Sequence, residues 1–133
     1  MEASVAARHS QAAKKVLLVD DCKTSLLVHE LHLSDLPYEI IKTQSGAEAL
    51  ARAIDDPPDL ILLDVMMPGT DGLEVQRELR ADERTRDIPV LLVTACGDPD
   101  TMSEATKRGC SDYLTKPVNG TELKSKVSRR LGA

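Results

Sequence analysis

The chain has 133 residues, a formal net charge of −5, 41% hydrophobic residues and 29% charged residues. This length suits one domain with its own core, and this composition is typical of a globular protein. The negative charge and the lack of a basic stripe argue against nucleic-acid binding. No apolar stretch is long enough to cross a membrane, and three cysteines without a CxxC motif indicate free thiols, so we expect a cytoplasmic protein.

Short apolar runs divide the chain into regular units. Residues 1–13 are rich in Ala, Ser and Gln, and we expect a flexible tail there, followed by one domain at 14–131. The apolar runs are rich in Val, Leu and Ile without alternation, which is typical of strands buried on both faces. We predict strands at Lys15–Val19, Glu39–Thr43, Leu60–Leu63, Pro89–Val93 and Ser111–Leu114.

Helical signals fill the gaps between these runs. Ser45 and Glu48 form a capping box that opens a helix reaching Ile54. Further helices are predicted from Asp71 to about Ala81, at Thr101–Arg108, and along the stripe of Leu123, Val127 and Leu131. Strands that alternate with helices predict an α/β protein of (βα)5 type. Its doubly wound parallel sheet would carry helices on both faces.

The first predicted helix lies between the strands Lys15–Val19 and Glu39–Thr43, and it is unusual because its apolar residues do not form one stripe. These residues are Leu26, Leu27, Val28, Leu31, Leu33 and Leu36. At 100° per residue they spread nearly all the way round, so part of this surface should stay exposed. The exposed part is a partner site, a surface covered by the N-terminal tail, or ordinary scattered leucines. His29 and His32 are three residues apart and can share a face, but two histidines alone make a poor metal site.

Polar side chains follow four of the predicted strands, at the point where each strand ends. Asp64 closes the third strand, and Asp20 and Asp21 follow the first. Thr94 follows the fourth strand and Lys116 follows the fifth. Because the carboxyl ends of parallel strands open on one crevice, we expect these five side chains to lie close together.

The chemistry of such a cluster favours a cation and a phosphoryl group. Three carboxylates forced together repel one another unless a proton or a cation lies among them, and hard oxygen ligands suit Mg²⁺. A lysine can hold a phosphate oxygen as a point charge, and a threonine hydroxyl can donate to another. Carboxylates are nucleophiles toward phosphorus. Together these groups indicate a site that forms an aspartyl phosphate.

The motifs at these strand ends resemble those of the receiver domains of two-component response regulators. The resemblance covers about 14–131, and it implies the flavodoxin-like strand order 2-1-3-4-5. The residues that carry it are Val19-Asp20-Asp21, Leu63-Asp64-Val65-Met66-Met67-Pro68-Gly69-Thr70-Asp71-Gly72, Val93-Thr94-Ala95 and Tyr113-Leu114-Thr115-Lys116-Pro117.

The resemblance also implies roles for the residues at the site. Asp64 would accept a phosphoryl group from a phosphohistidine of a sensor histidine kinase or a histidine phosphotransfer protein. Asp21, Asp64 and the backbone carbonyl of Met66 would bind Mg²⁺ or Mn²⁺ directly, and Asp20 would act largely through water. Lys116 would bind a phosphoryl oxygen. The chain would not be an enzyme beyond its own phosphorylation and dephosphorylation.

A second group of residues would convert phosphorylation into a signal. Thr94 would turn to hydrogen-bond the phosphate, and Tyr113 would follow it inward. The peptide bond before Pro117 would be cis, as in members of the family. The residues two past the phosphoacceptor and two past the threonine influence phosphate lifetime in the family. Here they are Met66 and Cys96, which cannot hold an attacking water strongly, so we expect slow self-dephosphorylation.

Several functions remain open at this point. Since no output domain follows Leu131, a receiver of this kind would act alone by binding a partner, relay phosphate onward, or be part of a longer chain. A haloacid-dehalogenase-type phosphohydrolase also uses an aspartate at a strand end, but Met66 stands where that family needs a second aspartate. A flavin or dinucleotide binder lacks its GxGxxG motif here. A receiver that only acts as a scaffold would not need the intact acidic and basic set.

Overall fold

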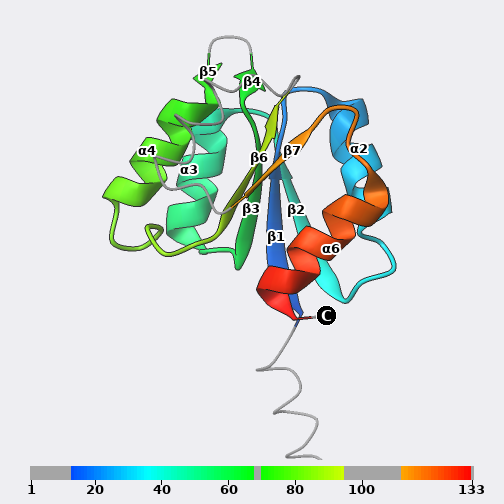
Figure 1. The fold of residues 1–133 in the computed structure, drawn as a ribbon. Helices are drawn as coiled ribbons and strands as arrows, with labels where there is room; N and C mark the ends of the chain where they lie inside the picture. Colours follow the sequence, from blue (N-terminus) through cyan, green and yellow to red (C-terminus); the bar gives the residue numbers. More distant parts are fainter. Residues whose placement is uncertain (1–12, 68–69, 95–111, 133) are drawn as a thin grey trace, which may run out of the picture.

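A computed structural model describes residues 13–67, 70–94 and 112–132. Its main feature is a five-stranded parallel sheet with the order β2-β1-β3-β6-β7 (Figure 1). Counted along the chain, these five strands have the predicted order 2-1-3-4-5. The strands are β1 (Lys14–Val19), β2 (Tyr38–Thr43), β3 (Leu60–Asp64), β6 (Val90–Thr94) and β7 (Asp112–Thr115).

Helices cover both faces of the sheet, as expected for a doubly wound fold. Figure 1 shows α3 (Gly46–Asp55) and α4 (Gly72–Ala81) on one face, and α2 (Lys23–His32) and α6 (Gly120–Leu131) on the other. A small antiparallel hairpin of β4 (Met66–Met67) and β5 (Thr70–Asp71) follows the central strand. No helix within the described residues has the length and apolar character needed to cross a membrane.

The central strands are buried on both faces, which explains their continuous apolar sequence. Every residue of β3 and β6 is buried. Alternate side chains therefore contribute to two separate cores, one on each side of the sheet. The core under α3 and α4 includes Leu17, Val19, Ile61, Leu63, Ala49, Ala53, Val75 and Leu79. The core under α2 and α6 includes Val16, Leu18, Leu62, Val93, Leu26, Leu33, Leu123 and Val127.

Most element boundaries agree with the sequence to within one or two residues. The predicted cap at Ser45 is present, because the Ser45 hydroxyl accepts a hydrogen bond from the amide of Glu48 at 3.1 Å. The reciprocal bond differs from a standard capping box, since the Glu48 carboxylate accepts from Gln44 rather than from Ser45. The β4–β5 hairpin was not predicted. The expected tail before residue 13, the helix Thr101–Arg108 and Cys96 lie outside the described residues.

The start of α4 fixes the backbone just after β3. A Cβ atom on Gly72 would lie 2.6 Å from the Cα atom of Val65 and 2.7 Å from the carbonyl oxygen of Asp64. The Gly72 amide also donates to the Val65 carbonyl at 3.1 Å. Only glycine permits this close approach of two backbones. The contact holds the segment that leaves Asp64 against the first turn of the helix.

Candidate functional site

Three carboxylates meet at the carboxyl ends of β1 and β3. Asp20, Asp21 and Asp64 each offer an oxygen, and these oxygens lie within 4.8 Å of one another. The two strands are neighbours with Val19 opposite Leu63, so the residues that follow them come together. Asp20 and Asp64 are only 2% and 3% exposed, whereas Asp21 is exposed. Among the described residues, no other group of three or more His, Cys, Asp or Glu has metal-binding spacing.

Local backbone amides orient the two buried carboxylates. One Asp20 oxygen accepts from the amide of Cys22 at 2.9 Å, and one Asp64 oxygen accepts from the amide of Met66 at 3.0 Å. The other Asp20 oxygen, Oδ2, is buried without a hydrogen-bond partner. A buried carboxylate oxygen without a partner is costly. A hydrated cation among the three carboxylates would bring the missing partner, through a water that it binds, so the residues present fit a divalent metal ion.

The ionisation of Asp20 reflects this crowded position. Burial, with a smaller contribution from the neighbouring Asp64, raises the pKa of Asp20 from its usual value of 3.8 to about 6. The Cys22 amide and the Lys116 ammonium act in the opposite direction. The cluster therefore resists carrying all its negative charge, and a cation would relieve that repulsion.

Lys116 brings a positive charge to the cluster from β7. Its ammonium nitrogen lies 3.1 Å from Oδ2 of Asp64, in an ion pair that spans the intervening strand β6. The amide of Lys116 donates to the carbonyl of Thr94 at 2.8 Å, which ties the turn after β7 to the end of β6. The peptide bond between Lys116 and Pro117 is cis, as predicted. The lysine is thus positioned by both its backbone and its side chain.

The remaining predicted residues surround the acidic cluster at different depths. Thr94 is the last residue of β6 and is 4% exposed, one position beyond Val93, which pairs with Asp64. Met66 is 66% exposed beside the cluster. Tyr113 is 39% exposed and does not lie in the core; the Lys126 ammonium is 5.4 Å from the centre of its ring. Tyr113 therefore has the outward orientation.

Two further residues near the site were not assigned roles from the sequence. The side-chain amide of Gln44 donates to the backbone carbonyl of Asp21 at 3.3 Å, and no sequence pattern indicates this bond. His29 is only 6% exposed. Burial lowers the pKa of His29 below its usual value of 6.5, and the positive charges of His32 and Lys116 lower it further. His29 is therefore a buried imidazole whose ionisation is sensitive to the site.

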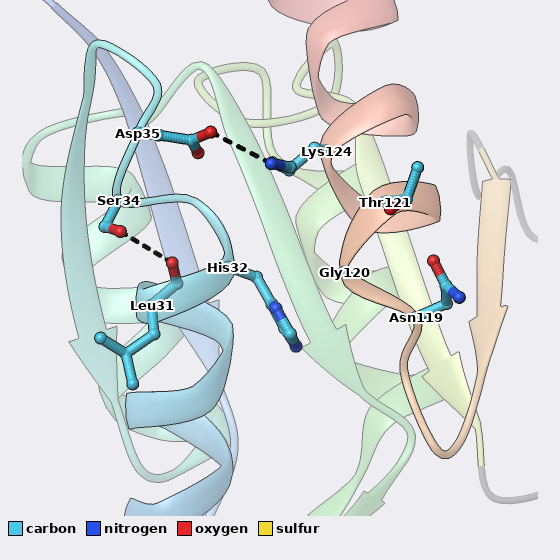
Figure 2. Close-up of a pocket in the computed structure, with 8 residues that line it drawn as sticks. All are labelled: Leu31, His32, Ser34, Asp35, Asn119, Gly120, Thr121 and Lys124. Carbon is cyan, nitrogen blue, oxygen red and sulfur yellow. Dashed lines mark hydrogen bonds and ion pairs between the residues drawn. The ribbon is translucent and has the colours of Figure 1, made fainter.

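A separate cleft of about 470 Å³ lies between the end of α2 and the first turn of α6 (Figure 2). The His32 ring lies close to Gly120, since a Cβ atom on this glycine would meet Nδ1 of His32 and would be 2.8 Å from its Cε1. An ion pair of 3.0 Å between Asp35 and Lys124 joins the two sides. None of the three clustered carboxylates lines this cleft.

These features define a class of protein: a doubly wound α/β domain with an acidic cluster and a lysine at the carboxyl ends of its strands. The chain belongs to the response regulator receiver domain family, whose family model matches residues 16–128. Receiver domains are phosphoacceptor domains of two-component signalling, and they bind Mg²⁺ at an acidic pocket. The resemblance found in the sequence and its predicted fold are thereby confirmed.

Three known proteins illustrate the relationship. The response regulator PleD of Caulobacter vibrioides is 42% identical over 113 residues, covering 85% of this chain but only 25% of PleD. The polar-differentiation response regulator DivK of Brucella ovis is 35% identical over 119 residues, covering 90% of this chain and 97% of DivK. The receiver domain of the sensor histidine kinase PA1611 of Pseudomonas aeruginosa has 32% identity and a TM-score of 0.82, covering 92% of this chain and all of that one (100%). That structure contains a magnesium ion coordinated in its active-site cleft.

Proposed function

We propose that Asp64 is the phosphoacceptor of this receiver. The observation that carries the proposal is the position of its carboxylate, which is 3% exposed and has one oxygen 3.1 Å from the Lys116 ammonium. The other oxygen is held by the Met66 amide at 3.0 Å. A carboxylate oriented in this way, beside a fixed positive charge, is prepared to attack a phosphorus atom without first reorganising.

The transfer would take a phosphoryl group from a phosphohistidine. An Asp64 oxygen attacks the phosphorus atom, the bond between phosphorus and the histidine nitrogen breaks, and its electron pair stays on that nitrogen. The donor is a sensor histidine kinase or a histidine phosphotransfer protein. Lys116 exchanges part of its contact with Asp64 for a phosphoryl oxygen, which offsets the added negative charge.

Mg²⁺, or Mn²⁺ in its place, is the cofactor that the acidic cluster fits. Asp21, Asp64 and the backbone carbonyl of Met66 would hold the ion directly, and Asp20 would act largely through water. The unpartnered Oδ2 atom of Asp20 and the purely oxygen-based donor set support this choice. When bound, the ion would offset the negative charge of the carboxylates and of the phosphoryl group.

Thr94 and Tyr113 would report phosphorylation to the outside of the domain. Thr94 stands at the end of the strand next to β3, where its hydroxyl can donate to a phosphoryl oxygen. Tyr113 then turns inward from its exposed position. The phosphate is expected to be long-lived, since the thioether of Met66 is a poor hydrogen-bonding partner for an attacking water.

The exposed leucines of α2 form the surface that we assign to the phosphoryl donor. Leu27 and Leu31 are 52% and 61% exposed, and they are one helical turn apart. Leu27 lines a hollow of about 270 Å³ together with Gln44, which bonds the backbone of Asp21. In this family, kinases and phosphotransfer proteins dock on this side of the fold. Leu27 brings this apolar surface close to Gln44 and so to the edge of the acidic cluster, which suits such a partner.

The test is phosphorylation by a small-molecule donor. The protein is mixed with Mg²⁺ and acetyl phosphate and weighed intact by mass spectrometry, beside Asp64→Asn as the matched control. We expect one added phosphoryl group on the wild type, and none on the variant or without Mg²⁺. An adduct of equal yield on Asp64→Asn would place the phosphoryl group elsewhere. No adduct on either protein, and no beryllofluoride complex, would contradict a phosphoacceptor role.

A further inference from the structure

Lys126 of α6 lies at the centre of a contact network on the outside of β7. Its ammonium donates to the backbone carbonyl of Tyr113 at 2.7 Å and to a carboxylate oxygen of Asp112 at 3.1 Å. A carboxylate oxygen of Glu122, one turn earlier on the helix, lies 3.5 Å away. The Lys126 side chain is only 17% exposed, which is low for a lysine.

These contacts leave the ammonium little freedom to move. An ammonium group has three hydrogens, and here three oxygens surround it. Two of those oxygens belong to β7 and one to α6, so the lysine joins the last strand to the last helix. The charge is therefore held in place by groups other than the Tyr113 ring.

The ring of Tyr113 lies beside this immobilised charge. The distance of 5.4 Å from the ammonium to the ring centre is within the range of a cation–π interaction. The backbone carbonyl of Tyr113 holds the lysine whichever way the ring points, because the carbonyl does not move with the side chain. Only the outward ring, however, gains the attraction of the charge.

We propose that Lys126 is a positioning residue that holds Tyr113 outward and thereby opposes activation. This inference rests on the proposed switch role of Tyr113. When the ring turns inward, it loses the cation, while the other contacts of Lys126 remain. A cation–π contact at an exposed site corresponds to about a two- to fivefold bias in the equilibrium between the two orientations. Loss of the charge at position 126 would shift that equilibrium toward the inward orientation.

The ring can be observed directly because the chain has only two tyrosines. With 3-fluorotyrosine incorporated, ¹⁹F NMR gives one signal for Tyr113 and one for Tyr38, which lies on β2 at the opposite edge of the sheet and serves as the reference. Spectra of the wild type without and with beryllofluoride and Mg²⁺ give the chemical shifts of Tyr113 in the outward and the inward orientation. The variants are Lys126→Met, which keeps the apolar stem, and Lys126→Arg, which keeps the charge.

We expect the Tyr113 signal of unmodified Lys126→Met to move toward the beryllofluoride position, with Tyr38 unchanged. The Tyr113 signal of Lys126→Arg should stay at the wild-type position. A Tyr113 signal in Lys126→Met that coincides with that of the wild type would overturn the inference alone. If the beryllofluoride complex forms but the Tyr113 signal of the wild type does not shift, Tyr113 does not act as a switch. That outcome would contradict both the proposed switch role and this inference.

A kinetic cycle separates the ring from other effects of the lysine. We expect acetyl phosphate to phosphorylate Lys126→Met about two to five times faster than the wild type, if outward Tyr113 opposes the reaction. In a Tyr113→Leu background the same substitution should have no accelerating effect, since no ring remains to be held. Acceleration that persists without the ring would show that Lys126 acts through β7 or α6 instead. Lys126→Gln repeats the test if Lys126→Met does not fold.

Discussion

The two helical layers of this domain cover the same sheet but differ in how their residues are used. On one side, α3 buries Gly46, Ala49 and Ala53 along a single stripe. On the other side, α2 buries Leu26 and the polar His29, while Leu27 and Leu31 remain exposed. A helix that only covers a sheet needs one apolar stripe. The exposed leucines of α2 exceed that requirement, and this is the surface that we assign to the phosphoryl donor.

The contacts between helices differ in the same way. In the first layer, Val75 and Leu79 of α4 and the alanines of α3 belong to one apolar core. In the second layer, α2 and α6 are joined at their outer side by an ion pair between Asp35 and Lys124, beside the polar cleft of Figure 2. Leu26 of α2 also shares an apolar core with Leu123 and Val127 of α6, so the second layer adds this polar contact at its outer side to the same kind of apolar packing.

The largest expected effect lies in the first layer, at Gly72. Gly72→Ala would place a methyl group against backbone atoms at 2.6 and 2.7 Å, and backbone cannot rotate away. We expect a loss of about 3 kcal/mol in the free energy of unfolding, at the upper end for overpacking. Urea unfolding of the variant beside the wild type measures it. A loss below about 1 kcal/mol would show that α4 is not fixed to the end of β3.

A pH-dependent effect is expected in the second layer, at His29. Burial, His32 and Lys116 lower its pKa in the folded state, while Asp64 partly offsets them. The unfolded chain then binds the proton more readily, so the free energy of unfolding falls as pH drops below about 6.5. The slope from one such group is at most about 1.4 kcal/mol per pH unit.

The measurement is urea unfolding between about pH 5 and 7.5, for the wild type and for His29→Leu. Asp20, whose folded pKa is raised to about 6, changes stability in the opposite sense over part of this range. Both proteins share that contribution, so their difference isolates His29. A difference that does not change with pH would mean that the imidazole is not buried in its neutral form.

A smaller effect on the free energy of unfolding is expected in the second layer, where Gly120 lies against His32. Gly120→Ala brings a methyl group against the His32 ring, which is a side chain able to rotate, unlike the backbone beside Gly72. We expect a loss of about 1 kcal/mol, and in a His32→Ala background a small gain, because alanine favours a helix over glycine. Thermal unfolding of the four proteins gives the coupling. Additive effects would contradict the close contact.

The smallest expected effect is at the exposed leucines of α2. Leu27→Gln and Leu31→Gln should each change the free energy of unfolding by less than about 0.5 kcal/mol, as is usual for surface positions. Their rates of phosphorylation by acetyl phosphate should match the wild type, since neither side chain belongs to the acidic cluster. A loss above about 1 kcal/mol would indicate that these leucines are covered by another part of the chain.

The sequence predicted the arrangement of strand ends because it depends on a general property of parallel sheets. Asp20, Asp64 and Lys116 each end or follow a buried run, and their convergence needs no knowledge of individual contacts. The positions of His29 and His32 show the limit of such reasoning. Helical period indicates that they share a side of α2, but not that one enters the core and the other meets Gly120, since that glycine comes from a distant segment.

Very short strands and single contacts between distant segments also could not be predicted. The strands β4 and β5 have two residues each, which is too short to show any period. The exposed ring of Tyr113 lies 5.4 Å from the ammonium of Lys126 on α6, and the spacing between the two residues carries no sequence signal. The side-chain amide of Gln44 donates to the backbone carbonyl of Asp21, and these residues lie in separate segments that only the fold brings together. Contacts between distant segments thus account for most of what was missed.

The strand order has a consequence for association between molecules. The sheet has two edges, β2 and β7, and each could in principle pair with a strand from another chain. Glu39 and Lys42 project from β2 and are exposed, and β7 begins with Asp112, which is paired with Lys126. Charged side chains at a sheet edge discourage continuous pairing into fibres. The charges on both edge strands therefore disfavour edge-to-edge joining of two such sheets into a larger one.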